Sequence, residues 1–171
     1  NRGSDITMKV GFPHYRILSS RKGEVRATPD FGMYDFRAWS ESVTYQPKSE
    51  KVTVGQFPED WFVWDMSFPR GGQVRLYVTY EQSLSDLRSD GLVDVFYVLT
   101  TGALWDGTIG DAVITVTSRN GGVFIDPEPP AAEVAPDRVT WRMRDFKPTE
   151  DLGVSYVPAT FWRAYRSTDE A

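Results

Sequence analysis

Hydrophobic and polar residues alternate with a period of two along much of this chain. In residues 73–80 (QVRLYVTY) every second side chain is apolar, which is the pattern of a strand with one buried face. The same alternation recurs in residues 6–10, 62–68 and 138–144. Residues 92–99 (LVDVFYVL) are apolar almost throughout, so they are expected to form a central strand covered on both faces. Residues 112–117 (AVITVT) predict a further strand because they are rich in β-branched side chains.

Glycine and proline mark the boundaries between these segments. Residues 69–72 (PRGG) predict a hairpin that joins two strands, and residues 120–122 (NGG) end the strand at 112–117. Residues 126–137 (DPEPPAAEVAPD) combine proline with acidic residues. They could be a linker between two domains or a long extended connection inside one. Too few residues follow them to build an independent core, so we favour the connection.

The chain shows strands and turns throughout, and no segment has the period of a long amphipathic helix. Roughly eight to ten mostly antiparallel strands predict an all-β fold, with an immunoglobulin-like β-sandwich as its leading form. The Cys…Trp…Cys signature of true immunoglobulin domains is absent, because the chain has 0 Cys. A length of 171 residues fits one domain. We therefore expect a single β-sandwich domain over residues 1–171.

The residue types needed for several kinds of catalysis are scarce. With 0 Cys and 1 His, disulfide scaffolds, thiol catalysis, iron–sulfur clusters and Cys/His zinc sites are excluded. The single imidazole, His14, is not accompanied by the Gly-X-Ser-X-Gly motif of a serine hydrolase. Carboxylate pairs could still act as acid and base in a hydrolase. The acidic residues near aromatic ones are Asp30, Asp35, Glu59, Asp60, Asp65, Asp106 and Asp111.

Acidic residues could also hold Ca²⁺ through their oxygen atoms. Asp106, which precedes Gly107, and Asp111 are the candidate metal ligands, and the acids of residues 126–137 are an alternative. Their spacing does not match the Asp-X-Asp-X-Asp-Gly pattern of an EF-hand loop. Asp-Gly is also a common turn dipeptide, so a turn is the competing interpretation.

Six Trp residues are many for a chain of this length. Exposed Trp and Tyr rings on a sandwich could form a platform that stacks on sugar rings, whereas buried ones would fill the core. Trp64 and Trp141 are in phase with apolar neighbours, so we expect both in the core. The others lie out of phase, at strand ends or in a glycine-containing loop. The candidate ligand-binding residues are therefore Trp39, Trp61, Trp105 and Trp162.

The charge pattern argues against a nucleic-acid partner. The net charge is −5 and the basic residues are scattered, whereas a protein that binds nucleic acid usually has a basic face. No apolar run approaches the length of a membrane-spanning helix. The chain starts at Asn1 without Met or an apolar leader, so we expect a fragment from which any export signal is missing.

Three stretches of the chain together resemble a known family. They are residues 62–80 (FVWDMSFPRGGQVRLYVTY), 97–116 (YVLTTGALWDGTIGDAVITV) and 139–156 (VTWRMRDFKPTEDLGVSY), with residues 10–13 (VGFP) in addition. They are similar to bacterial exported or cell-surface domains of the family numbered 4424 among domains of unknown function. The resemblance implies a β-sandwich in an extracellular, cell-surface or periplasmic protein. It carries no known catalytic residues.

These observations predict a non-catalytic structural or interaction module of an exported bacterial cell-envelope protein, with no cofactor. A protein or a cell-wall polysaccharide would be its partner. A carbohydrate-binding module that uses exposed Trp and Tyr is the second hypothesis, and a carboxylate-based hydrolase is the third.

Overall fold

The computed structural model describes residues 3–14, 18–19, 26–27, 33–54, 57–82, 84, 91–104 and 107–162. Antiparallel sheets dominate these residues, with a 3-10 segment, η1 (Thr100–Leu104), and a helical turn at residues 159–162. The predicted all-β class is confirmed. The chain divides into two compact units, Asn1–Ser83 (unit 1) and Leu84–Ala171 (unit 2). The single domain over residues 1–171 stays a prediction.

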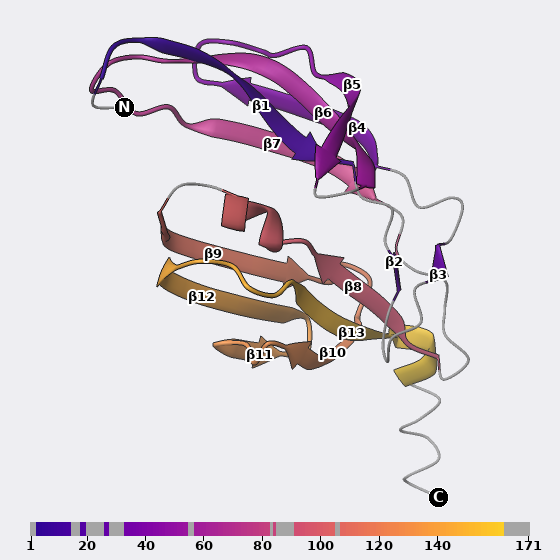
Figure 1. Cartoon of the computed structure of the whole chain (residues 1–171). Helices are drawn as coiled ribbons and strands as arrows, with labels where there is room; N and C mark the ends of the chain where they lie inside the picture. Colours follow the sequence, from indigo (N-terminus) through magenta and orange to yellow (C-terminus); the bar gives the residue numbers. More distant parts are fainter. Residues whose placement is uncertain are drawn as a thin grey trace, which may run out of the picture. The chain divides into compact units, whose positions relative to one another are not determined.

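Unit 1 contains two sheets and one short strand pair (Figure 1). The first sheet has the order β1 (Ile6–Pro13), β6 (Phe57–Phe68), β5 (Lys48–Val54). In the second, β4 (Met33–Ser40) pairs with β7 (Leu76–Gln82), and β2 (Leu18–Ser19) pairs with β3 (Arg26–Ala27). The strands predicted at residues 6–10, 62–68 and 73–80 are therefore present, although β7 begins and ends later than expected.

The alternation along β6 builds the core of unit 1. Trp64 and Met66 are 6% and 2% exposed, and Ala38 of β4 is 1% exposed. These residues come from different sheets and form one buried cluster, so the two sheets share a core. Partly buried side chains from β1 and β7 complete it. The expectation that Trp64 is a core residue is confirmed.

The turn at residues 69–72 forms as predicted, but it does not make a hairpin. Gly72 N donates to Pro69 O over 3.1 Å. However, β6 pairs with β1 and β5, whereas β7 pairs with β4. The chain therefore crosses from one sheet to the other at this turn. In the second sheet, where β7 pairs with β4, Leu76 and Val78 of β7 pack against the core of unit 1.

Unit 2 also contains two antiparallel sheets (Figure 1). The first has the order β10 (Gly122–Glu128), β13 (Leu152–Pro158), β8 (Val93–Tyr97). The second has the order β11 (Glu133–Ala135), β12 (Arg138–Phe146), β9 (Ile109–Thr117). The strands predicted at residues 112–117 and 138–144 are β9 and β12, each longer than expected. The predicted turn at residues 120–122 separates β9 from β10, which lie in different sheets.

Side chains of both sheets meet in the core of unit 2. Val139 and Trp141 of β12 are 0% and 3% exposed, and Leu152 and Val154 of β13 are 2% and 3% exposed. The expectation that Trp141 is a core residue is confirmed. Its indole Nε1 donates to Pro129 O over 2.8 Å.

The proline-rich stretch at residues 126–137 lies within unit 2. The second half of this stretch contains β11, which pairs with β12. Ala132 N donates to Thr140 O over 3.0 Å, and Phe124 N donates to Pro136 O over 3.1 Å. These backbone bonds fasten the stretch to the strands before and after it, as expected of an extended connection inside one folded unit.

The apolar segment at residues 92–99 occupies a different place from the one predicted. It forms β8, which lies at the edge of its sheet, and the central strand is β13. Asp94 of β8 is 8% exposed and accepts a hydrogen bond of 3.0 Å from Ser155 Oγ. A run of apolar residues indicates buried faces but not whether both edges of the strand are paired, so the central position was predicted wrongly.

Candidate functional site

A tight reversal after β4 positions a hollow in unit 1. Ser40 N donates to Val43 O over 2.8 Å, and Val43 N donates back to Ser40 Oγ over 3.2 Å. Serine favours such turns because its hydroxyl can replace a backbone partner. Tyr45 N then donates to Ala38 O over 3.0 Å. The reversal therefore lays residues 44–47 beside β4.

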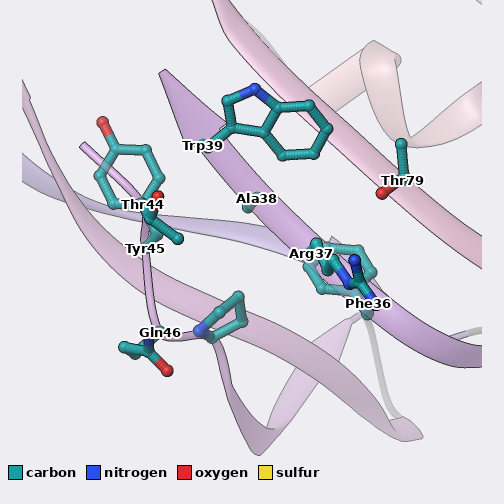
Figure 2. A pocket seen from close by; sticks show the side chains of 9 residues that line it. Phe36, Arg37, Ala38, Trp39, Thr44, Tyr45, Gln46 and Thr79 are labelled. Atoms are coloured by element: carbon teal, nitrogen blue, oxygen red, sulfur yellow. The ribbon is translucent and has the colours of Figure 1, made fainter. Parts of the chain in front are cut away.

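The hollow lies along the edge of β4, between this strand and residues 44–47, with a volume of about 390 Å³. We call it the Trp39 hollow. It is lined by Phe36, Arg37, Ala38, Trp39, Thr44, Tyr45, Gln46, Pro47 and Thr79 (Figure 2). Its walls combine aromatic surface with one guanidinium, one amide and several hydroxyl groups. That mixture is typical of a site for a small polar ligand.

Two stacked rings stand on the outward face of the β4–β7 sheet. Trp39 and Tyr77 are cross-strand partners, with ring centroids 5.5 Å apart and planes only 13° from parallel. Trp39 is half-buried and Tyr77 is 37% exposed. A hydrogen bond to Tyr77 raises the pKa of Arg75. Trp39 lines the hollow and Tyr77 does not, so the stacked pair contributes an aromatic wall to the hollow through the Trp39 ring.

The Trp39 hollow has one charged side chain. Arg37 is exposed, and within the described residues no carboxylate pairs with it. Arg75, on the same strand face as Tyr77, differs because its Nη1 lies 3.9 Å from Glu41 Oε1. No Asp or Glu is among the nine residues that line the hollow. Among the described lining residues Arg37 therefore contributes the only formal charge, which is positive, although the whole chain carries a net charge of −5.

A buried polar atom lies under the aromatic wall of the hollow. Trp64 Nε1 has no hydrogen-bond partner among the described residues. The Trp64 ring packs against Tyr45 and Phe36, at centroid distances of 6.1 Å and 6.0 Å. Leaving such a donor unpaired costs about 1–3 kcal/mol. The core beside the hollow therefore carries a local energetic cost that a hydrogen-bond acceptor for this indole would remove.

A second hollow, of about 430 Å³, shares Tyr45 with the first. It is lined by both signs of charge, from Glu41, Asp65 and Arg75, and by polar residues such as Ser67 and Gln73. It lacks an exposed aromatic pair. We therefore regard the Trp39 hollow as the better candidate for ligand binding.

The other Trp residues predicted to bind ligand have different environments. Trp61 lies over Gly11, where an added Cβ would come within 2.7 Å of its ring, and its Nε1 donates to Glu59 Oε2 over 3.2 Å. Neither Trp61 nor Trp162 lines the Trp39 hollow. Trp162 is half-buried in the helical turn at residues 159–162 of unit 2. Trp105 lies outside the described residues.

The sequence reasoning singled out only Trp39 and missed the other eight described residues of the hollow. Arg37, Tyr45 and Gln46 come from β4 and from the segment after the reversal. The polar turn Ser40-Glu41-Ser42 and the nearby Pro47 were the available signals, because they predict that the chain folds back beside the strand.

The predicted metal ligands are not gathered in the part of the structure that is described. Asp111 is exposed, and its Oδ1 lies 3.2 Å from Arg144 Nε, its cross-strand neighbour. Asp106 lies outside the described residues. In the described ranges no group of three or more His, Cys, Asp or Glu could hold a metal ion. A site that uses Asp106 and Asp111 remains a prediction.

The single His and several predicted carboxylates have structural partners. Met33 is 8% exposed, and its backbone N–H donates to His14 Nε2 over 3.1 Å. The carboxylate of Asp60 lies 3.0 Å from Lys51 Nζ, and Glu59 accepts the indole N–H described above. Asp30 lies outside the described residues. Asp35 and Asp65 are exposed, and a hydrolase that uses a carboxylate pair stays a prediction.

Two motifs that carried the family resemblance meet in unit 2. Asp151 Oδ1 accepts bonds from Leu99 N and Thr100 N, each 2.9 Å long, and from Thr100 Oγ1 at 2.8 Å. It thereby caps the start of η1. A Cβ at Gly102 would lie 3.3 Å from Pro148 Cγ, so the second motif also packs on η1. The two stretches form one structured loop that leads to residues 105–106.

Replacing Asp151 should loosen this loop. We expect Asp151→Ala to lower the free energy of unfolding by about 1–2 kcal/mol, because three donors lose one shared acceptor. Hydrogen exchange of the η1 amides would report the loss, and Glu150→Ala, at the neighbouring exposed position, is the matched control. Equal exchange rates in both variants would show that the cap contributes nothing.

Comparison with known proteins agrees with the resemblance. Residues 89–155 match the family described as Domain of unknown function (DUF4424). The match lies within unit 2 and includes the structured loop around η1. No curated protein matches the chain. Within the described residues, no helix is long and apolar enough to cross a membrane.

A solved structure has a similar fold. It is the crystal structure of a candidate nutrient-binding protein from Legionella pneumophila subsp. pneumophila strain Philadelphia 1, with a TM-score of 0.67. The two sequences are 19% identical, and the alignment covers 95% of this chain. This chain spans 58% of the length of the Legionella protein. At that identity the likeness concerns the fold.

Proposed function

We propose that this chain is a non-catalytic binding module of an exported bacterial cell-envelope protein, located outside the cell, at its surface or in the periplasm. Its ligand site is the Trp39 hollow, and its ligand is a small polar molecule or one residue of a larger polymer. The single observation that carries the proposal is the stacked Trp39–Tyr77 pair beside a hollow lined with polar groups. The description of the Legionella neighbour as nutrient-binding is compatible with it.

The sequence predicted one immunoglobulin-like sandwich over residues 1–171, whereas the fold proposed here is such a sandwich in each unit. It is supported by two antiparallel sheets that share one core in unit 1 and by the same arrangement in unit 2. In such sandwiches the binding residues stand on strand faces, edges and connecting loops. The Trp39 hollow lies at such an edge.

Carbohydrate binding is the favoured form of this function. A planar ring that is partly exposed can stack on the apolar face of a sugar, and the surrounding groups can bond its hydroxyls. Trp39 supplies the ring, and Thr44, Gln46 and Thr79 supply donors and acceptors. A protein partner would instead be expected to need a broad contact surface. The Trp39 hollow is a small pocket of about 390 Å³.

The proposal is tested by calorimetric titration of the purified chain with a panel of neutral and acidic oligosaccharides. We expect binding to weaken at least tenfold in Trp39→Ala, because a central aromatic residue contributes about 2 kcal/mol or more to binding. Trp61→Phe is the matched control, since Trp61 does not line the hollow. If no panel member binds, or if both variants bind like the parent chain, the proposed site is wrong.

A further inference from the structure

The charges around the Trp39 hollow suggest what kind of ligand it takes. Arg37 is the single charged residue among the described residues of its lining, and it is exposed. Among the described residues it has no carboxylate partner, whereas Arg75 lies near Glu41 and Arg144 lies near Asp111. A guanidinium that no described acidic residue faces attracts an anion, and its fork matches a carboxylate.

The spacing along β4 places this charge beside the aromatic surface. Arg37 and Trp39 are two residues apart and pair with Thr79 and Tyr77 in unbroken register. Side chains two apart on a strand point to the same face, roughly 6–7 Å from each other. That distance is close to the width of one six-membered sugar ring. A ring stacked on Trp39 would therefore bring a substituent at its edge to Arg37.

The remaining polar groups suit the other edges of such a ring. Thr79 lies opposite Arg37 on β7, whereas Gln46 lines the hollow from the segment after the reversal, on the side away from Trp39 and Thr79 (Figure 2). Hydroxyl and amide groups can both donate and accept, as recognition of sugar hydroxyls requires. None of these groups adds a negative charge that would oppose a carboxylate.

We propose that the Trp39 hollow binds a carboxylated sugar of the uronic acid class, with the ring on Trp39 and the carboxylate on Arg37. This inference rests on the proposed function and names its ligand. Since the attraction is partly between exposed charges, binding weakens as the salt concentration rises.

The test compares two probes of the same shape. The purified full chain is titrated calorimetrically with trigalacturonate and with its fully methyl-esterified form, which has no charge, and the pair is repeated with glucuronate-containing oligomers. We expect the acidic form to bind roughly tenfold more tightly, the value of one charge-assisted hydrogen bond. Arg37→Gln should abolish this preference, and Arg142→Gln, which removes an exposed charge from unit 2, should keep it.

The outcomes separate this inference from the proposed function. Equal binding of acidic and esterified forms, or an unchanged preference in Arg37→Gln, overturns the assignment of a carboxylate ligand. Binding of neutral sugars that Trp39→Ala weakens would leave the proposed function standing in that case. If no probe and no panel sugar binds in a Trp39-dependent way, both are overturned.

Discussion

Gly122→Ala is expected to destabilise unit 2 by at least about 3 kcal/mol. The backbone conformation at this residue is strained for any side chain, and the neighbouring atoms leave no room for a Cβ. Gly122 has φ of 101°, a conformation that L-residues with a side chain rarely adopt. An added Cβ would overlap the carbonyl oxygen of Val157 and lie 2.7 Å from the hydroxyl oxygen of Tyr156. Backbone cannot move aside as a flexible side chain can, so the start of β10 would separate from β13.

The neighbouring glycine provides a matched control. Gly121 also has a positive φ, of 71°, but an added Cβ would make only an ordinary contact of 3.5 Å with Ala159. We expect Gly121→Ala to cost about 1–2 kcal/mol, from the backbone conformation alone.

Denaturant unfolding followed by circular dichroism compares the two variants. Hydrogen exchange of β13 amides shows whether the loss lies at this strand pair. If Gly122→Ala is as stable as Gly121→Ala or more stable, residue 122 does not lie as close to the Val157 carbonyl as described.

Trp141→Phe is expected to cost about 2–4 kcal/mol, more than the same change at the other buried indole, Trp64. Both substitutions remove similar volume from a core, since Trp141 and Trp64 are 3% and 6% exposed. The Trp141 indole also donates to Pro129 O over 2.8 Å, and Phe would leave that carbonyl without its donor. Trp64 Nε1 has no partner within the described residues, so its removal abandons no acceptor.

The difference between the two Trp→Phe variants should be about 0.5–1.5 kcal/mol, the net value of one hydrogen bond, because the bond to Pro129 O is only partly buried. Hydrogen exchange of β12 amides in unit 2 and β6 amides in unit 1 measures each loss in its own unit. Equal losses would mean that the bond to Pro129 contributes nothing net to stability.

Much of the local structure was predictable from the sequence. The alternation in residues 62–68 placed Trp64 in the core, and the same pattern around Trp141 did so for β12. Glycine and proline located the reversals at residues 69–72 and 120–122. These features depend on neighbours a few residues away, since backbone freedom at glycine and the two-residue period of a strand are local properties.

Strand partners were not predictable in the same way. The turn at residues 69–72 was expected to pair the strands on either side, yet β6 and β7 belong to different sheets. The apolar run at residues 92–99 was expected in the centre of a sheet but lies at an edge, beside β13. Pairing depends on which faces can be buried together, and that involves residues far apart in the chain.

The candidate site shows the same division. The sequence by itself indicated only that Trp39 is out of phase with its apolar neighbours or at a strand end, which made it a candidate for exposure. Only the tertiary structure decided that Tyr77 stacks on Trp39, and that Arg37 lines the hollow without a carboxylate beside it. Trp39 and Tyr77 come from strands that are distant in sequence and adjacent in the sheet. A pattern of single residues predicts which face is exposed, but contacts across a sheet exist only once the register is formed.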